Sequence, residues 1–205
     1  MLVKVLIPGR LKEELKMRKL SGALVLLVSV LVLSLSGVAD AASKGYYENG
    51  NLKWEYIHDG GQIKEARFYG EDGQLKSVNV YAGGQLTEAR GYGDGGKLKW
   101  QTLYVGGKMA TGREYYPTGE VEKEYTYKDD KVDGVYKKFD TKGKLLEQFT
   151  YKSDVLDGPG KSWYETGELK SEFSYKNGKL DGPFKQLYKN GKPQGEYIYK
   201  EGVLQ

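Results

Sequence analysis

Apolar and polar residues alternate in short segments along most of the chain. Residues 169–176 show the pattern, with Leu169, Phe173 and Tyr175 separated by polar positions. A period of two places alternate side chains on one face, so the segment predicts a β-strand with one apolar face. Asn177-Gly178 follows the strand, and both residue types tolerate the positive φ of a two-residue hairpin turn.

The same strand returns at a fixed spacing. The aromatic residues that end the strands follow one another in steps of 23 or 24 residues, and a histidine holds the first position: His58, Tyr81, Tyr104, Tyr127, Tyr151, Tyr175 and Tyr199. A second series consists of turn glycines: Gly50, Gly73, Gly95, Gly119, Gly143, Gly167 and Gly191. A period this regular indicates a repeat array rather than a compact enzyme domain.

Each repeat reads as two short strands and two turns. One hairpin alone is marginal in water, so neighbouring hairpins have to pair and bury the aromatic series between them. The pattern predicts an all-β fold, an elongated single-sheet array of β-hairpin repeats with a period of 23–24 residues. The array runs continuously over residues 42–205 as about seven units. After Gly112, Asp-Gly pairs appear at a regular spacing, at 133–134, 157–158 and 181–182. Pro193 replaces the usual Leu or Val, so the last unit is predicted to be a cap.

Residues 1–41 do not share the repeat. Basic residues precede an apolar run at 24–35, and Ala39-Asp40-Ala41 supplies a small-x-small site. This arrangement is typical of a secretory signal peptide, with cleavage expected after Ala41. The prediction is therefore an exported protein, periplasmic or extracellular, with no stable membrane span after cleavage.

Two alternatives concern this leader. An uncleaved membrane anchor over residues 20–39 is the first, because that stretch barely reaches the length of a span. The second concerns the start of translation. Beginning at Met17 would give a compact signal peptide, which leads to the hypothesis that residues 1–16 are not translated.

Charge and cysteine content exclude several function classes. The chain has 32 basic and 28 acidic residues, of which the leader holds six and three, leaving 26 against 25. Nucleic-acid binding usually needs a strong basic stripe, so nucleic acid is not an expected partner. The absence of cysteine excludes disulfides and cysteine-based metal sites, and a single histidine excludes a histidine cluster. No cofactor or metal is expected.

The turn motifs resemble a known family. Tyr-Glu-Asn-Gly at 47–50, Lys-Asn-Gly-Lys-Leu-Asp-Gly at 176–182 and Tyr-Lys-Asn-Gly at 188–191 resemble the variant MORN repeat, and the chain is similar to YwqK-type antitoxin-like repeat proteins. The resemblance covers residues 45–205 and implies rows of β-hairpins that bind partners or act as scaffolds rather than catalyse reactions. With an export signal, it implies an envelope role or immunity to a toxin acting outside the cytoplasm.

Three groups of residues are candidates for chemistry, each with a simpler structural interpretation. His58 is a candidate base or pH sensor, but it stands where tyrosine stands elsewhere, and packing is the simpler interpretation. The acidic segments 128–134 and 153–158 offer few of the six or more oxygens that calcium needs, and turn chemistry explains them. No catalytic set can be assembled, so the chain is not expected to be an enzyme.

The aromatic series leaves two binding functions open. The main prediction is a protein-binding scaffold or antitoxin-like module, and the alternative is an envelope glycan or choline-type ligand held on the aromatic face. For most positions packing is the simpler interpretation of the rings. Specificity is then expected at the variable positions on the same strands: Ser77, Thr102, Lys123, Glu147 and Ser171.

Overall fold

The computed structural model describes residues 43–205, which belong to one compact unit. The signal peptide predicted for residues 1–41 and the alternative start at Met17 lie outside the described residues. Among the described residues, no helix is long and apolar enough to cross a membrane.

Residues 43–205 form one sheet of 17 strands. The strands are β1 (Ser43–Tyr46), β2 (Leu52–Asp59), β3 (Gln62–Tyr69), β4 (Leu75–Ala82), β5 (Gln85–Tyr92), β6 (Leu98–Val105), β7 (Lys108–Tyr115), β8 (Val121–Lys128), β9 (Lys131–Phe139), β10 (Leu145–Lys152), β11 (Val155–Leu156), β12 (Gly158–Trp163), β13 (Leu169–Lys176), β14 (Lys179–Leu180), β15 (Gly182–Leu187), β16 (Pro193–Lys200) and β17 (Val203–Leu204). One 3-10 turn in the described part of the chain, η1 (Asp94–Gly96), lies between β5 and β6.

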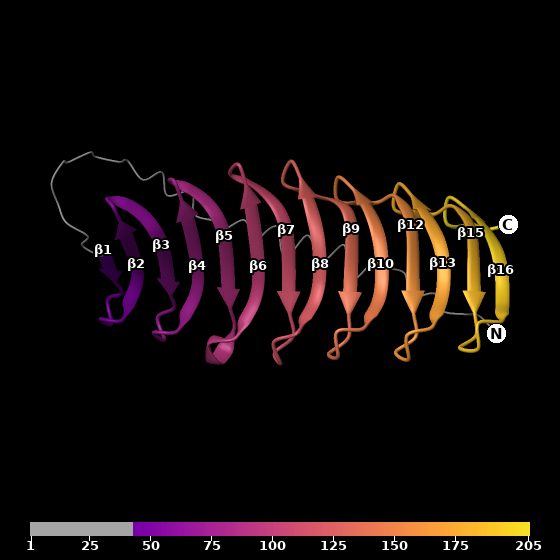
Figure 1. Cartoon of the computed structure of the whole chain (residues 1–205), viewed down its shortest axis with the longest axis horizontal. Coiled ribbons are helices and arrows are strands. Elements are labelled where there is room, and N and C mark those ends of the chain that lie inside the picture. Colours follow the sequence, from indigo (N-terminus) through magenta and orange to yellow (C-terminus); the bar gives the residue numbers. More distant parts are fainter. Residues whose placement is uncertain (1–42) are drawn as a thin grey trace. The chain divides into compact units, whose positions relative to one another are not determined.

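The strands are antiparallel and follow one another in chain order (Figure 1). Each repeat has a first strand, such as β8, and a second strand, such as β9. A first strand pairs on both sides in the same register: Tyr125 faces Gly112 of β7 on one side and Tyr136 of β9 on the other. This arrangement confirms the predicted all-β array of hairpin repeats.

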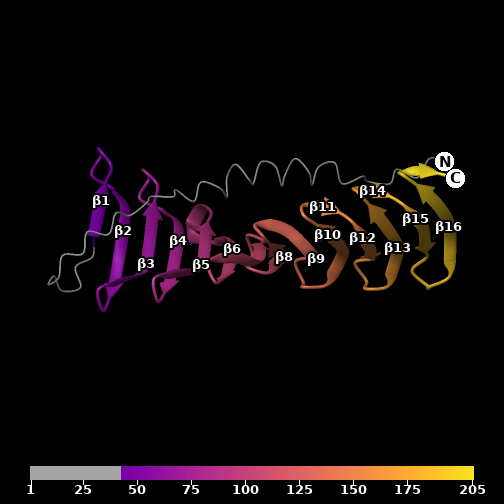
Figure 2. The same ribbon diagram turned by 90° about the horizontal axis from the view of Figure 1, so that it is seen from above.

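Nearly every hairpin contains a register shift close to one of its ends, as between Leu103 and Tyr104. Bulges of this kind increase the local right-handed twist of a sheet. The strands accordingly change direction along the row when the sheet is seen from above (Figure 2).

The step from 23 to 24 residues has a local cause. β7, a second strand of the earlier repeats, has eight residues, whereas β9, the second strand of the next repeat, has nine. The extra residue falls at Asp133-Gly134, and Gly134 has a φ of 101°. The sequence suggested that the Asp-Gly pairs form turns, but they do not form the hairpin turns. Asp133-Gly134 lies within β9, whereas the later pairs lie at the breaks between β11 and β12 and between β14 and β15. The turns are made by preceding pairs such as Asn177-Gly178, with φ of 50° and 80°.

Residues 43–205 supply a single layer, so most of the core lies on one face of the sheet. We call this the ladder face, because it carries the series from His58 to Tyr199, and we call the opposite side the outer face. Ala66, Ala89, Tyr136 and Tyr151 on the ladder face are between 1% and 4% exposed. With no second layer from these residues, side chains can be buried only by their neighbours on the same face.

Candidate binding face

The structure places the seven residues from His58 to Tyr199 in one row across the ladder face. Each faces an aliphatic residue on the following strand: Ile63, Leu86, Met109, Val132, Leu156, Leu180 and Leu204. Burial differs along the row. Tyr151 is only 4% exposed, and burial raises the pKa of the Tyr104, Tyr151 and Tyr175 hydroxyls above the usual value.

A second row runs through the middle of the ladder face. In the later repeats it is a continuous series of rings in contact, with centroids 5.7 to 6.1 Å apart between Tyr125 and Tyr136, Tyr136 and Phe149, Phe149 and Phe173, and Phe173 and Phe184. The part of this row that lies on the second strands was not among the residues predicted from the sequence. Its signal is the same period, in the residues Ala66, Ala89, Gly112, Tyr136, Gly160 and Phe184.

Rings lie against glycines on the adjacent strand. A Cβ atom added at Gly91 would overlap the Trp100 ring, and one added at Gly160 would overlap the Phe173 ring. Both glycines are buried, and neither has a positive φ. The glycine is therefore required by the close approach of the ring, which covers the backbone of a sheet that has no second layer here.

A charged pair is buried in the ladder face near the change of repeat style. Lys123 Nζ lies 3.1 Å from Glu114 Oε2, and the Tyr125 hydroxyl donates to Glu114 Oε1 at 3.2 Å. Glu114 is 4% exposed and Lys123 is 8% exposed. Buried charges of this kind are tolerated when each is paired, and they fix the arrangement of their neighbours. Glu114 lies opposite Trp100 of β6, so Trp100 and the pair share one row across the sheet.

Four of the five variable positions named from the sequence lie in one row with this pair: Ser77, Lys123, Glu147 and Ser171. Thr102 lies in the central row, opposite Ala89 and Gly112. Ser171 is buried, and its hydroxyl lies 2.6 Å from the Ser162 hydroxyl. Lys123 and Ser171 therefore already have partners within the sheet, which the alternation of residues alone did not reveal.

The outer face carries paired charges rather than a basic stripe. Second strands present one cation each in a transverse row: Lys44, Arg67, Arg90, Arg113, Lys137, Lys161 and Lys185. Acidic residues lie beside most of them, as in Arg90–Glu88 at 2.6 Å, Arg113–Glu124 at 2.9 Å and Lys161–Glu172 at 2.8 Å. The hydrogen bond from Arg90 lowers the pKa of the Glu88 carboxyl.

The two-residue turns of the later repeats are held by the preceding repeat. The Asp133, Asp157 and Asp181 carboxylates accept hydrogen bonds from the amides of Ser153, Asn177 and Glu201 at 3.1 to 3.2 Å. The Asp-Gly element is therefore a contact between repeats. The bond from the Glu201 amide is the main cause that lowers the pKa of Asp181.

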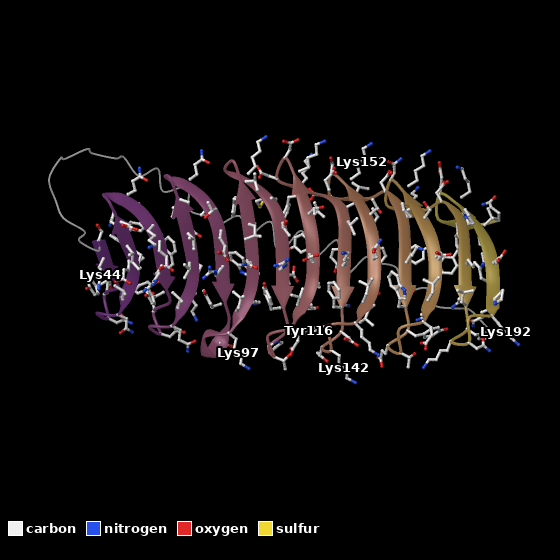
Figure 3. The ribbon with its side chains drawn as sticks, in the orientation of Figure 1. Lys44, Lys97, Tyr116, Lys142, Lys152 and Lys192 are labelled. Carbon is white, nitrogen blue, oxygen red and sulfur yellow. The ribbon has the colours of Figure 1, made fainter. Side chains whose placement is uncertain are left out.

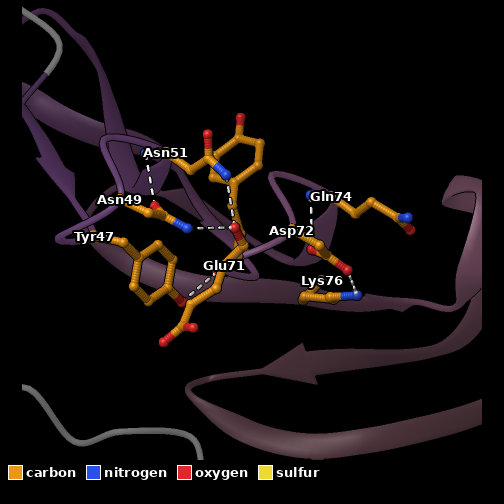
Figure 4. A network of polar contacts seen from close by, with 8 residues as sticks. Tyr47, Asn49, Asn51, Glu71, Asp72, Gln74 and Lys76 are labelled. Carbon is orange, nitrogen blue, oxygen red and sulfur yellow. Dashed lines mark hydrogen bonds and ion pairs between the residues drawn. The ribbon is translucent and has the colours of Figure 1, made fainter.

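The four-residue turns at the opposite edge are also linked from repeat to repeat. Figure 4 shows the first link, where the Tyr47 hydroxyl donates to the Tyr69 carbonyl at 2.8 Å and the Asn49 and Asn51 amides donate to the Glu71 carbonyl. Charged side chains line both turn edges, with Lys97, Lys142 and Lys192 along this one and Lys152 along the other (Figure 3).

The turn glycines close these four-residue turns. The Gly50, Gly73, Gly119, Gly143, Gly167 and Gly191 amides each donate to the carbonyl three residues earlier. In the turn between β5 and β6 the donor is Gly96, whereas the sequence series runs through Gly95. Both residues have a φ of 70°, and only the hydrogen bonds distinguish them.

His58 faces Ile63 at the start of the ladder row, and its Nδ1 is buried with no hydrogen-bond partner among the described residues. Within residues 43–205 no group of three or more His, Cys, Asp or Glu side chains could hold a metal ion. The ladder face thus offers rings, aliphatic side chains and one buried ion pair, and this combination suits binding.

Comparison with known families agrees with this architecture. Residues 110–129, 132–153, 156–177 and 180–201 match the MORN repeat variant as four tandem repeats. The match confirms the variant MORN resemblance for this part of the chain. A search of curated proteins found no match to the sequence.

Similarity to solved structures is low. The accessory secretory proteins 1, 2 and 3 of Streptococcus pneumoniae match at 14% identity and a TM-score of 0.37, over 50% of this chain and 19% of that chain. The glycosylation-associated protein complex of Streptococcus agalactiae matches at 17% and 0.39, over 53% and 20%. A GtfA/B complex bound to UDP and GlcNAc matches at 13% and 0.28, over 70% and 29%. The chain spans less than a third of each.

Proposed function

We propose that this chain is an exported, non-catalytic repeat protein that binds a protein partner across the ladder face in the cell envelope. The observation that carries the proposal is the single layer. Tyr104, Tyr127 and Tyr175 stay partly exposed, because residues 43–205 provide nothing to cover them.

A protein partner suits the chemistry of this face. Interface centres are enriched in tyrosine, tryptophan and phenylalanine and depleted in charge, whereas their rims are polar. The ladder face has the same arrangement, with rings in the middle rows and charged turns at both edges. The antitoxin-like resemblance makes a toxin acting outside the cytoplasm one partner of this kind.

Photo-crosslinking from neighbouring residues tests which face binds. Successive strand residues point to opposite faces, so a photoreactive amino acid at Tyr127 probes the ladder face and one at Thr126 probes the outer face. Tyr197 and Ile198 form a second matched pair near the other end. Adducts with the same protein from Tyr127 and Tyr197, and not from Thr126 and Ile198, support the proposal. Adducts confined to the outer-face positions contradict it.

The glycan alternative and the export prediction need separate assays. Saturable sedimentation with purified envelope polysaccharide, reduced by choline and lost when Tyr127 is replaced, would favour the glycan alternative if no protein adduct forms.

Export is tested by cell fractionation and N-terminal sequencing of the expressed full chain. A new N-terminus at Ala42 is expected, and an intact leader on protein retained in the cytoplasm would overturn that part of the proposal.

A further inference from the structure

The two ends of the sheet present parts that fit each other. Inside the sheet, second strands such as β12 and β15 have a first strand on each side. β1 at one end is the last part of a second strand, and among residues 43–205 it has one neighbour, β2. At the other end, β16 has a following neighbour within residues 43–205 only near its end, where Tyr199 and Lys200 pair with β17 and the Gln205 amide donates to the Ile198 carbonyl.

The register of β1 matches the position that is empty beside β16. Ser43, Lys44 and Gly45 face Tyr56, Glu55 and Trp54. In the last complete hairpin, the equivalent residues Phe184, Lys185 and Gln186 face Tyr197, Glu196 and Gly195. Because a first strand pairs in the same register on both sides, these three β16 residues are the ones that β1 of a second copy would face.

The charges at the two ends are complementary. Lys44 contacts Glu55 at 2.9 Å on one side and belongs to the transverse row of cations on the outer face. Glu196 lies 3.8 Å from Lys185 on one side, and its side chain is 68% exposed. Placing Lys44 of a second copy beside Glu196 would continue the alternation of cation and anion found at Lys161, Glu172 and Lys185.

The tyrosine links between turns give an independent observation. The Tyr47, Tyr116 and Tyr164 hydroxyls donate to the carbonyls of Tyr69, Phe139 and Leu187 in the next repeat, each at 2.8 Å. Tyr188 holds the same position in the last turn, is 50% exposed, and makes no hydroxyl hydrogen bond within residues 43–205. Its equivalent acceptor would be the carbonyl at the position of Tyr46, whose side chain is 62% exposed.

We propose that the β16 edge of one copy binds the β1 edge of a second copy, so that the sheet continues from chain to chain. Ser43, Lys44 and Gly45 of the second copy would lie opposite Tyr197, Glu196 and Gly195, and Tyr188 would donate to the Tyr46 carbonyl of the second copy. The contact joins two different edges, so it is heterologous and can repeat along a series of copies. Few residues take part, and such a contact is weak unless copies are concentrated.

Disulfide trapping tests the register, because the chain has no cysteine of its own. The full chain, expressed with its own leader, is made as Lys44→Cys and as Glu196→Cys, and the two are mixed under oxidation. We expect a mixed disulfide dimer at least about fivefold above the Lys44→Cys and Glu172→Cys mixture. Glu172 is the matched control because it lies in the same row, one repeat earlier, with Lys161 and Lys185 opposite it. A yield equal to that control overturns the proposal, and so does preferential Glu196→Cys self-dimerisation, which indicates symmetric pairing.

Sedimentation of hydroxyl variants tests the tyrosine link. Tyr188→Phe is expected to weaken self-association about two- to tenfold, the range for one hydrogen bond, and to leave the melting temperature of dilute protein unchanged. Tyr164→Phe removes a link within the chain and is expected to lower the melting temperature with association retained. Average mass should rise steadily with concentration. A monomer at every concentration, a plateau at the dimer, or unchanged association of Tyr188→Phe overturns the proposal.

Discussion

Replacing Tyr151 measures how a single-layer sheet obtains its stability. Tyr151 is 4% exposed and lies 5.8 Å from the Tyr136 ring, so its side chain is buried by neighbours on the ladder face. A buried aromatic side chain removes about 150–250 Å² from water. At ~25 cal/mol per Å² this is an upper limit of roughly 4–6 kcal/mol, because the denatured chain also buries some area. Tyr151→Ala is expected to cost about 3–5 kcal/mol.

Urea unfolding, followed by circular dichroism and by tryptophan fluorescence, is the assay. Two probes are needed because repeat arrays can unfold in parts. Tyr46→Ala is the control, since that side chain is 62% exposed, and its expected change is within about 0.5 kcal/mol at low protein concentration. Tyr151→Phe keeps the ring and should retain most of the stability. Equal costs for Tyr151→Ala and Tyr46→Ala, or for Tyr151→Phe and Tyr151→Ala, would refute the reasoning.

Tyr151, Gly160 and Asp157 each make a contact whose loss can be measured. Burial raises the pKa of Tyr151 above 10.0 in the folded state. The stability that this shift gives the folded chain is therefore complete below about pH 10 and is lost as pH rises through the folded pKa. Urea titrations at pH 8 and about pH 11 should show a smaller loss of unfolding free energy at the higher pH for Tyr151→Phe than for the native chain. Gly160→Ala should cost about 1–3 kcal/mol, because the new Cβ overlaps the Phe173 ring, whereas Gly93→Ala, with no heavy atom nearer than 4.0 Å, should melt like the native chain. Asp157→Ala should lower unfolding free energy by about 0.5–1.5 kcal/mol and speed hydrogen exchange at the Asn177 amide; unchanged exchange there would show that the carboxylate does not couple the repeats.

Much of the fold could be predicted from the two periods in the sequence, two residues within a strand and 23–24 residues between repeats. The strand alternation and the recurring tyrosines indicated hairpins, one sheet and the common row from His58 to Tyr199, because the side-chain direction in a strand depends only on the backbone. The turn glycines were found for a related reason, since a positive φ strongly favours glycine. Gly96 was missed because two glycines follow each other and local sequence does not choose between them.

Contacts between strands of different repeats were much harder to predict. The pattern placed Lys123 and Ser171 on the apolar face but did not show that Glu114 and Ser162 lie beside them, because the partners come from other strands in a register set by bulges. The Asp-Gly pairs were interpreted as turns for the same reason. Their carboxylates accept hydrogen bonds from amides about twenty residues away, in the turn of the next repeat.

The sequence by itself determined the repeat, the strands, the single-sheet class and the residues that share a face, because these follow from periods of two and of 23–24 residues along one chain. Only the tertiary structure decided how deeply each ring is buried, which glycines make room for rings, and which polar groups join neighbouring repeats. These properties depend on distances across the sheet. In a single layer every side chain is buried by its lateral neighbours. Register and bulges therefore determine the burial and the contacts of each side chain, and composition does not.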